Sequence, residues 1–293
     1  MNIYYAIGGG LGHLTRGCAF LRQFGLENET AILTSSKFSS DRRVVGNIKI
    51  ISVDDNLSLS KTRFRTFLNE TFRKLECRKL YLDAFPFGIL GEFVNFDFRG
   101  IELFYIARIL NWHNYQNRET APAKQFSKTF VVENLDESHL EFIRRNSTAV
   151  ENLDLIYHAQ TAIDQNLLQK IIKSHAPFWL VVHGGSDEET KELVAFAREI
   201  RDAEKATACI VVVSPNKFDI ENAYDIYPAS VLFPFAEKII TACGFNVMKQ
   251  TADFRRKHFF LPFERRFDDQ FLRAKNARHE YAEQITIPDF TAL

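Results

Sequence analysis

The sequence predicts an α/β protein made of two doubly wound domains, each built on a parallel sheet. Short β-branched or aromatic runs alternate with helix-length segments along the chain, a pattern typical of parallel sheets wrapped by helices. The 293 residues suit two domains of roughly 140 residues each better than one core. A hydrophobic fraction of 46%, with 28 Phe, supplies apolar side chains for both cores. Two such domains imply a cleft.

The first half of the chain carries a series of apolar runs of strand length. These runs are Asn2–Ile7, Ala31–Thr34, Ile48–Val53, Lys79–Asp83, Leu103–Ile106 and Thr129–Val132. The polar stretch 158–169 follows this series. We therefore place the domain boundary near residue 160 and expect domains of residues 1–160 and 161–293.

The second half has the same alternation without any repeat of the sequence itself. Its strand candidates are Pro177–Val182, Ala208–Val213, Ala223–Ile226, Lys238–Thr241 and His258–Leu261. Between them, 188–201 has apolar residues at helical spacing. Ligands of such sheets bind beyond the carboxyl ends of the strands, so the loops that follow the strands are the expected sites of chemistry.

Charge and cysteine content argue against several classes of protein. The 37 Lys and Arg residues balance 37 Asp and Glu residues, so no overall field attracts nucleic acid, and we expect no nucleic-acid partner. The four Cys have no C-x-x-C spacing and no secretory leader ahead of them, which predicts reduced thiols in a cytoplasmic protein. No run of about 18 uninterrupted apolar residues occurs, so we expect no membrane-spanning segment.

The loop after the first strand has the composition of a ligand-binding turn. Gly8-Gly9-Gly10-Leu11-Gly12-His13 leads from that strand into a helix-like stretch. A glycine turn lets backbone N–H groups approach an anion or a sugar, and the helix N-terminus adds partial positive charge. The turn does not match G-x-G-x-x-G, and no G-K-[ST] follows, which argues against a dinucleotide and excludes a Walker loop. The alternative is a tight turn with a structural histidine that caps the helix.

Three further loops, all in the second half, repeat this strand-to-helix pattern. Gly184, Gly185 and Ser186 follow a buried strand and His183, and a plain turn is the alternative reading. The segment 241–246 places Gly244 between a strand and a helix. The segment 263–270 opens the last helix with carboxylates and an amide, groups that hydrogen-bond sugar hydroxyls well. Its alternative is a charged, solvated helix start.

In their order and spacing, these motifs resemble the GT-B glycosyltransferases of family 28, the group of the lipid-linked peptidoglycan N-acetylglucosaminyltransferase, and the related nucleotide-sugar hydrolases. The resemblance spans nearly the whole chain. In the first half, Gly12-His13 with Arg16 is similar to the G-x-G-H-x-x-R of the hydrolases, and Leu82–Gly88 is similar to the D-x-F-P-F-G of related predicted transferases. In the second half, Ile240–Asn246 is similar to the family's I-T-x-x-G-x-N, and Asp268-Asp269-Gln270 stands in the place of a D-x-Q or Q-Q pair.

The resemblance implies two Rossmann-like domains that face a cleft, with the acceptor side in residues 1–160. Residues 161–293 would bind the nucleotide-sugar donor and end in a helix that could return to the first domain. The implied donor-binding residues are Gly10, Gly12, Gly184, Gly185, Ser186, Cys243, Gly244, Phe245, Asn246, Gln250, Asp269 and Gln270. Gln250 stands where transferases of this family commonly carry a glutamate that holds the nucleotide ribose. The chain is also short for a GT-B transferase and closer in length to the hydrolases.

The resemblance also implies a chemistry. His13 would act as general base for an acceptor hydroxyl, or for water in a hydrolase, and displacement would be direct, with inversion. Asp83 is a second candidate base, with a helix-capping or salt-bridged aspartate as the alternative. No metal and no cofactor is expected. The expected activity is transfer of a hexose or N-acetylhexosamine, UDP-linked, to a glycan, lipid-linked or other hydroxyl acceptor. The alternatives are a nucleotide-sugar hydrolase and a non-catalytic nucleotide-sugar-binding protein.

The segment Lys61–Lys79 has a basic amphipathic pattern, with Phe and Leu recurring at helical spacing. Such a helix could lie on the inner face of an anionic membrane and bring a cytoplasmic enzyme to a lipid-linked acceptor. The alternative, which we favour, is a Phe stripe that faces the core and has a solvated basic back.

Overall fold

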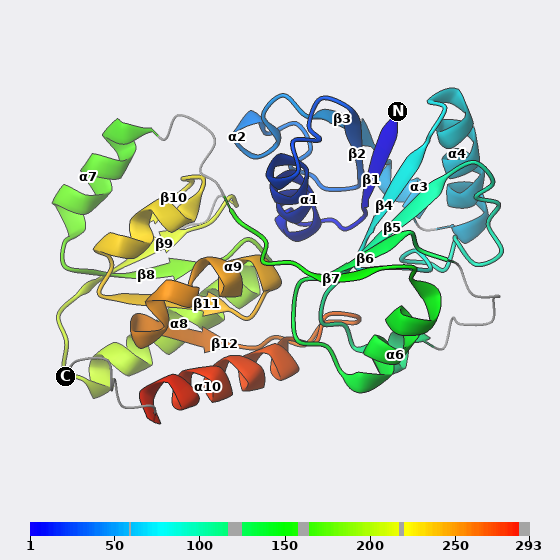
Figure 1. The fold of residues 1–293 in the computed structure, drawn as a ribbon. Coiled ribbons are helices and arrows are strands. Elements are labelled where there is room, and N and C mark those ends of the chain that lie inside the picture. Colours follow the sequence, from blue (N-terminus) through cyan, green and yellow to red (C-terminus); the bar gives the residue numbers. More distant parts are fainter. Residues whose placement is uncertain (59, 117–124, 158–163, 217–219, 287–293) are drawn as a thin grey trace. The chain divides into compact units, whose positions relative to one another are not determined.

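The computed structural model describes residues 1–58, 60–116, 125–157, 164–216 and 220–286. The chain divides into two compact units (Figure 1). Unit 1 consists of Met1–Gln160 and Arg266–Asp268, and unit 2 of Thr161–Arg265 and Asp269–Leu293. The predicted boundary near residue 160 falls in 158–163, outside the described residues.

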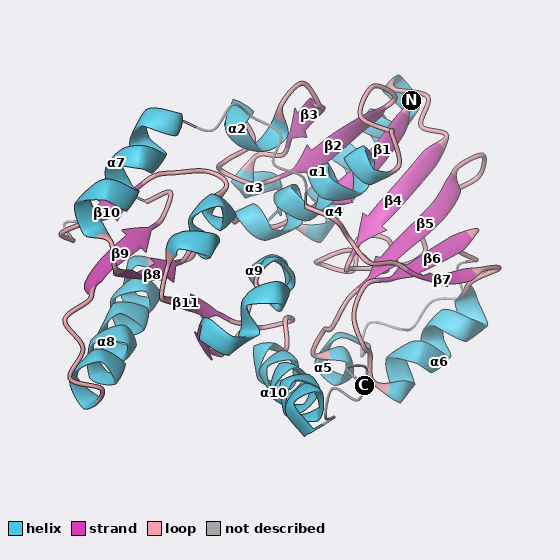
Figure 2. Cartoon of the chain, turned by 60° about the vertical axis from the view of Figure 1, so that its left-hand side comes forward, coloured by secondary structure: helices cyan, strands magenta, loops and turns pink. Residues whose placement is uncertain are grey.

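Unit 1 is built on a parallel sheet with the strand order β3-β2-β1-β4-β5-β6-β7 (Figure 2). Its strands are β1 (Asn2–Ala6), β2 (Thr30–Thr34), β3 (Lys49–Ser52), β4 (Lys79–Asp83), β5 (Glu102–Ala107), β6 (Lys128–Val131) and β7 (Val150–Asn152). The strands expected from the sequence are confirmed. β7 was not expected, because it is a short edge strand whose side chains are exposed or half-buried and carry no apolar run.

Successive side chains of β1 show why this sheet is wrapped on both faces. The ring of Tyr4 packs on Phe20 of α1 (Leu11–Gln23), with centroids 5.6 Å apart, whereas the ring of Tyr5 packs on Phe64 of α4 (Lys61–Lys74), with centroids 6.3 Å apart. Neighbouring residues of a strand point to opposite faces, so the aromatic pair binds one helix to each side. The helices of unit 1 are α1 (Leu11–Gln23), α2 (Arg42–Val45), α3 (Asp55–Ser58), α4 (Lys61–Lys74), α5 (Trp112–Gln116) and α6 (Glu137–Asn146).

Unit 2 has a smaller parallel sheet with the order β10-β9-β8-β11-β12. Its strands are β8 (Phe178–Val182), β9 (Cys209–Val213), β10 (Ala223–Tyr224), β11 (Lys238–Ala242) and β12 (His258–Leu261). Its helices are α7 (Gln165–His175), α8 (Asp187–Ala203), η1 (Ala229–Phe235), α9 (Phe245–Gln250), η2 (Ala252–Lys257) and α10 (Gln270–Thr286). Trp179 of β8 packs in the core on the α8 side, and its neighbour Phe178 in the core that includes α7 and η1.

Helix starts differ at the glycine turns. Several helices begin at a side chain that accepts a hydrogen bond from the first turn: Asp41, Ser60, Asp136, Asp164 and Ser186. By contrast, α1 begins at Gly10 and α9 at Gly244, and neither has a side-chain cap. These two helix starts follow β1 and β11, in loops that the sequence singles out as sites.

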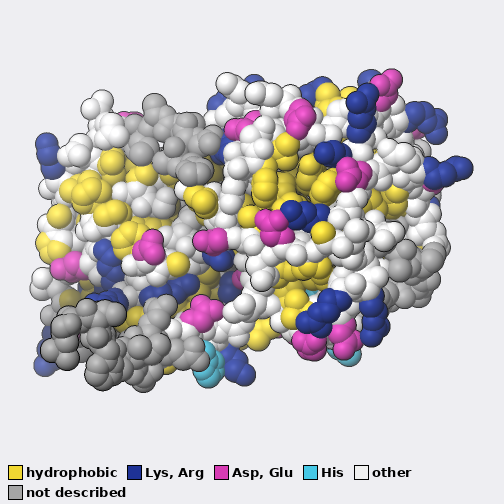
Figure 3. All heavy atoms as spheres, in the orientation of Figure 1, with side chains coloured by type: hydrophobic (Ala, Val, Ile, Leu, Met, Phe, Trp, Pro, Cys, Tyr) yellow, Lys and Arg dark blue, Asp and Glu magenta, His cyan; other side chains and the backbone are white. Residues whose placement is uncertain are grey.

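The Phe stripe of Lys61–Lys79 faces the core of unit 1. Phe64, Leu68 and Phe72 of α4 are buried, as the core-facing interpretation predicts. The basic residues of the segment remain at the surface. On the face drawn in Figure 3, Lys and Arg side chains lie interspersed with Asp and Glu side chains. Among the described residues, no helix combines the length and the apolar character that a membrane span requires.

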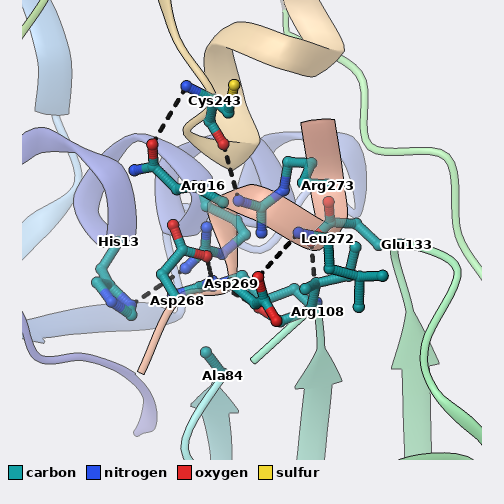
Figure 4. Close-up of polar contacts among 12 residues, drawn as sticks. His13, Arg16, Ala84, Arg108, Glu133, Cys243, Asp268, Asp269, Leu272 and Arg273 are labelled. Atoms are coloured by element: carbon teal, nitrogen blue, oxygen red, sulfur yellow. Dashed lines mark hydrogen bonds and ion pairs between the residues drawn. The ribbon is translucent and has the colours of Figure 1, made fainter. Parts of the chain in front are cut away.

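The three residues Arg266–Asp268 belong to unit 1 through side-chain packing. The ring of Phe267 lies 5.7 Å from that of Phe85, centroid to centroid. Asp268 forms an ion pair with the buried Arg108 (Figure 4). An aromatic side chain and a counter-ion from the C-terminal part of the sequence thus complete unit 1.

Candidate functional site

Strand order brings two of the predicted site segments of unit 1 together. β1, which leads into the glycine turn, lies between β2 and β4, and β4 ends at Asp83. The register pairs Tyr5 with Leu82, so the two strands end side by side. Strand order also reverses at β1, with β2 and β3 to one side and β4 onward to the other. A reversal of this kind is where open α/β sheets bind their ligands.

His13 and Asp83 form a hydrogen-bonded pair at this point. His13 lies in the first turn of α1, and its Nδ1 is 2.6 Å from Oδ2 of Asp83. Asp83 is fully buried, whereas the side chain of His13 is 16% exposed. A carboxylate can only accept, so Nδ1 carries the proton and Nε2 is left as a bare acceptor. Within the described residues, no group hydrogen-bonds to Nε2.

Arg16 completes the group, and the sequence reasoning missed its role. Its Nε donates to Oδ1 of Asp83 at 2.6 Å and its Nη2 to Oδ2 at 2.8 Å, a bidentate arrangement. Arg16 is 2% exposed. The spacing carried a signal: Arg16 follows His13 by three residues, so both lie on the same face of α1.

The pKa values of the pair follow from burial and from these charges. Burial alone would raise the pKa of Asp83, but Arg16 and then His13 hold it well below its usual range. Burial lowers the pKa of His13, Asp83 opposes this, and Arg16 and Arg108 add to the lowering. At neutral pH the pair is therefore a carboxylate beside a neutral imidazole, the state of a general base.

Asp83 has the position of an orienting group. Both of its oxygens lie on His13 or Arg16, and the side chain has no exposed surface. This is the salt-bridged aspartate that the sequence left open as an alternative to a second base. A buried carboxylate of this kind fixes the tautomer of the imidazole and stabilises its protonated form.

Gly8 and Phe85 both lie close to the imidazole of His13. A Cβ at Gly8 would lie 2.6 Å from Cδ2 of His13, closer than any real side chain can approach. The ring of Phe85 lies 5.3 Å from the imidazole, centroid to centroid. At Gly10 and Gly12, by contrast, a Cβ would meet nothing within 4 Å. The turn thus contains one glycine that the histidine requires and others that leave open space.

In unit 2, the turn after β8 is organised by an ion-paired histidine. Nε2 of His183 lies 2.8 Å from Oε2 of Glu189, and Nη2 of Arg265 lies 2.7 Å from the same oxygen. Burial lowers the pKa of His183 despite Glu189. A Cβ at Gly185 would lie 2.3 Å from Nε2 of His183, so this glycine is required by packing. Ser186 caps α8 by accepting from the N–H of Glu189. The sequence reasoning did not assign roles to His183, Glu189 and Arg265.

The turn after β11 is held by the first turns of α10. The N–H of Cys243 donates to Oε1 of Gln270 at 3.3 Å, and its carbonyl accepts from Nη1 of Arg273 at 2.9 Å (Figure 4). Cys243 and Phe245 are buried, so their side chains do not reach a ligand, and both backbone groups of Cys243 are engaged by Gln270 and Arg273. At Gly244 a Cβ would meet nothing within 4 Å, which leaves open space over the start of α9. Asn246 and Gln250 on α9 are half-buried.

Asp269 and Gln270 have structural contacts in addition to their predicted role as sugar ligands. Oε1 of Gln270 accepts from the N–H of Phe263 at 3.0 Å as well as from Cys243, and the side chain is buried. Oδ1 of Asp269 accepts from the N–H of Leu272 at 2.8 Å. In the described part of the chain, the amide nitrogen of Gln270 and the second oxygen of Asp269 have no hydrogen bond. Only those atoms are left for a ligand.

A search of the described residues finds no group of three or more His, Cys, Asp or Glu side chains that could hold a metal ion. In unit 1, His13, Asp83 and Arg16 form the hydrogen-bonded group described above. Unit 2 offers two glycine turns, those containing Gly185 and Gly244.

No protein-family model matches the sequence, and no curated protein matches it. Solved structures do match the fold. The S. aureus protein MnaA, solved with UDP, has a TM-score of 0.59 and 12% identity over 98% of this chain and 88% of its own. The spinosyn rhamnosyltransferase SpnG, complexed with thymidine diphosphate, has a TM-score of 0.57 and 10% identity over 96% of this chain and 85% of its own. A Listeria monocytogenes protein assigned as a UDP-N-acetylglucosamine 2-epimerase has a TM-score of 0.53 and 9% identity over 87% of this chain and 77% of its own. The chain has the GT-B fold that its sequence predicts.

Proposed function

We propose that this protein is a glycosyltransferase that takes a sugar from a nucleotide-sugar donor without a metal ion and inverts the anomeric centre. The observation that carries the proposal is the His13–Asp83 hydrogen bond of 2.6 Å, with Nε2 of His13 left as a bare acceptor in a partly exposed ring. The similar structures solved with UDP or thymidine diphosphate support a nucleoside diphosphate as the leaving group.

The pair in unit 1 can activate a hydroxyl. Nε2 of His13 takes the proton of the acceptor hydroxyl while that oxygen bonds to the anomeric carbon. The bond from this carbon to the diphosphate oxygen breaks, and its electron pair leaves with the nucleoside diphosphate. Asp83 stabilises the imidazolium that forms, and it stays ionised because Arg16 binds both of its oxygens. Displacement in one step inverts the configuration.

We assign the donor to unit 2. The backbone N–H groups at Gly184–Ser186 and at Gly244–Asn246, the part of the second turn beyond Cys243, would approach the diphosphate, since N–H groups at strand-to-helix turns favour anions. The open space over Gly244 suits close approach. The amide nitrogen of Gln270 and the second oxygen of Asp269 would hold sugar hydroxyls, and Gln250 would lie toward the nucleoside. We propose a UDP-linked hexose or N-acetylhexosamine as donor and a glycan, lipid-linked or other hydroxyl as acceptor.

A nucleotide-sugar hydrolase is the second candidate. A histidine that can activate an acceptor hydroxyl can also activate water, and His13 is partly exposed. A hydrolase needs no acceptor other than water, so the two activities differ in whether product forms without an added acceptor.

The test is a panel of nucleotide sugars, first by thermal shift and then by NMR of the products, with and without sugar and lipid-linked acceptors. A ligand that binds only the folded state raises the melting temperature, so a stabilising donor identifies the base and the sugar together. Product that forms only with an acceptor supports the transferase. Free sugar formed with water alone supports the hydrolase, and a changed sugar still bound to its nucleotide argues against both. His13→Ala should abolish turnover and spare donor binding, whereas His113→Ala, at an exposed histidine, should leave both turnover and binding unchanged. If no nucleotide sugar stabilises the protein, the proposal fails.

A further inference from the structure

A second hydrogen-bonded pair of side chains, Tyr105 and His139, contacts the residue that follows Asp83. Ala84, the next residue, has a φ of 65°, in the left-handed region that costs a residue with a Cβ free energy. Its N–H donates to the carbonyl of Ile106 at 3.0 Å, and its carbonyl accepts from Oη of Tyr105 at 3.1 Å. Both backbone groups of Ala84, the residue that follows Asp83, are thus hydrogen-bonded to β5.

Tyr105 is held in turn by His139. Oη of Tyr105 lies 2.9 Å from Nε2 of His139, and neither residue has exposed surface. The indole of Trp112 stacks on the imidazole, with centroids 3.9 Å apart and planes within 5°. The chain of contacts therefore runs from α6 through β5 to the end of β4.

The direction of these hydrogen bonds follows from the chemistry of the groups. The carbonyl of Ala84 can only accept, so the hydroxyl of Tyr105 donates to it and has only its oxygen left for His139. His139 must then donate from Nε2, which makes it the neutral Nε2–H tautomer with a bare Nδ1. Burial lowers the pKa of His139 to about 3, and Nδ1 has no partner among the described residues, as a bare acceptor would. One hydrogen-bond direction satisfies both contacts.

We propose that Tyr105, held by His139, is a positioning residue that keeps the Ala84 turn in place and so directs the Asp83 carboxylate at Nδ1 of His13. Arg16 fixes the charge of Asp83, and Tyr105 fixes the backbone from which Asp83 projects. The proposal rests on the proposed function in that it gives the His13–Asp83 pair a catalytic use. It names no contact of Tyr105 with substrate.

The test compares Tyr105→Phe with Tyr81→Phe. Both changes remove one hydroxyl from a buried tyrosine of the same sheet, but the Tyr81 hydroxyl hydrogen-bonds to none of the described residues. NMR on the protein alone gives the decisive measurement: the downfield proton signal of Nδ1 and the pKa of His13, identified by their absence in His13→Gln. Asp83 opposes the lowering of that pKa, so a displaced Asp83 should lower it by about one unit. We expect this shift, with loss of the downfield signal, in Tyr105→Phe and not in Tyr81→Phe.

Two variants of His139 keep the proposal testable if Tyr105→Phe does not fold. His139→Gln retains an N–H where Nε2 lies and should preserve the His13 signal, whereas His139→Phe should lose it. In turnover, Tyr105→Phe should lower kcat about tenfold and leave the donor KM unchanged. An unchanged His13 pKa and an unchanged downfield signal in folded Tyr105→Phe would overturn the proposal. If His13→Ala retains full turnover, the proposed function fails instead, while the NMR comparison still decides the role of Tyr105.

Discussion

Arg16 binds the carboxylate of Asp83 through two nitrogens, Nε at 2.6 Å and Nη2 at 2.8 Å, from within α1. The same helix carries His13, which hydrogen-bonds to the same carboxylate. The base, its orienting group and the cation that keeps that group ionised thus come from one helix and one strand end. Because the three side chains meet at one carboxylate, a change in any one of them should affect the other two.

Arg16→Met should destabilise the fold and reduce turnover. Removing one partner of a buried ion pair leaves a buried charge uncompensated and costs about 3–5 kcal/mol. The free energy of unfolding, from urea titration, checks the first effect. The exposed pair Arg99–Asp97 is the control, because Arg99→Ala should leave the free energy of unfolding nearly unchanged. Equal losses in the two variants would contradict the assigned role of Arg16.

The pH dependence of turnover should report the low pKa of His13. The histidine must be neutral to accept a proton, and burial holds its pKa below its ordinary value, so the acid limb of kcat/KM should lie below about pH 6.5. Asp83→Asn removes the group that opposes this lowering, so the limb should move further toward acid as kcat falls. A limb above pH 7 would exclude His13 as the base.

The stability of the protein at acid pH should depend on the protonation of Asp83. Its pKa is depressed in the folded state, so its contribution to stability is present above the unfolded pKa of about 3.9 and is lost as pH falls toward the folded value. His13, whose folded pKa is also lowered, adds to the loss from about pH 6.5 downward. The free energy of unfolding of the parent protein, from urea titration, should therefore fall steadily between pH 7 and pH 3, and a value that stays constant over this range would contradict both assignments.

Gly8→Ala should impair catalysis more than it impairs folding. Its Cβ would lie 2.6 Å from Cδ2 of His13 and would push the imidazole away from Asp83. Displacement of a catalytic group by about 1 Å can cost on the order of 100-fold in rate. Gly9→Ala is the matched control, because a Cβ there meets nothing within 4 Å. Steady-state kinetics of both variants, with circular dichroism, separates the effects, and equal rates would show that Gly8 is not needed by His13.

Gly244→Val should leave the stability of the protein nearly unchanged and weaken the binding of the nucleotide-sugar donor. The new side chain would extend into open space over the start of α9, where we place the diphosphate. The nucleotide-induced thermal shift measures the effect. Gly185→Ala is the contrasting variant: its Cβ would lie 2.3 Å from Nε2 of His183, so the protein itself should lose stability. An undiminished thermal shift in Gly244→Val would place the donor elsewhere.

The strand pattern could be predicted because the strands carry short apolar runs. Lys79–Asp83 and His258–Leu261 agree with the structure residue for residue. The exposed edge strand Val150–Asn152 could not be found this way, since its residues carry no apolar signal. An apolar run therefore determines which strands can be predicted from the sequence.

The candidate site was only partly predictable. His13 and Asp83 each stand out in the sequence, but their contact depends on β1 and β4 being neighbours across 70 residues of chain, which no local pattern encodes. Gln270 matched a sugar-binding motif, yet its carbonyl oxygen holds the backbone of Cys243 and Phe263. The motif marked the right loop without distinguishing the atoms that fold the turn from those left for a ligand.

The assignment of Arg266–Asp268 to unit 1 governs how the protein can be dissected. A fragment that ends at residue 160 would lack Phe267, which packs on Phe85 beside His13, and Asp268, the ion-pair partner of buried Arg108. The complementary fragment would carry those two side chains with no surface of its own to bury them. Separate expression of the two halves therefore exposes Phe267 in the second half and leaves Arg108 without its counter-ion in the first, so the two halves should be expressed together.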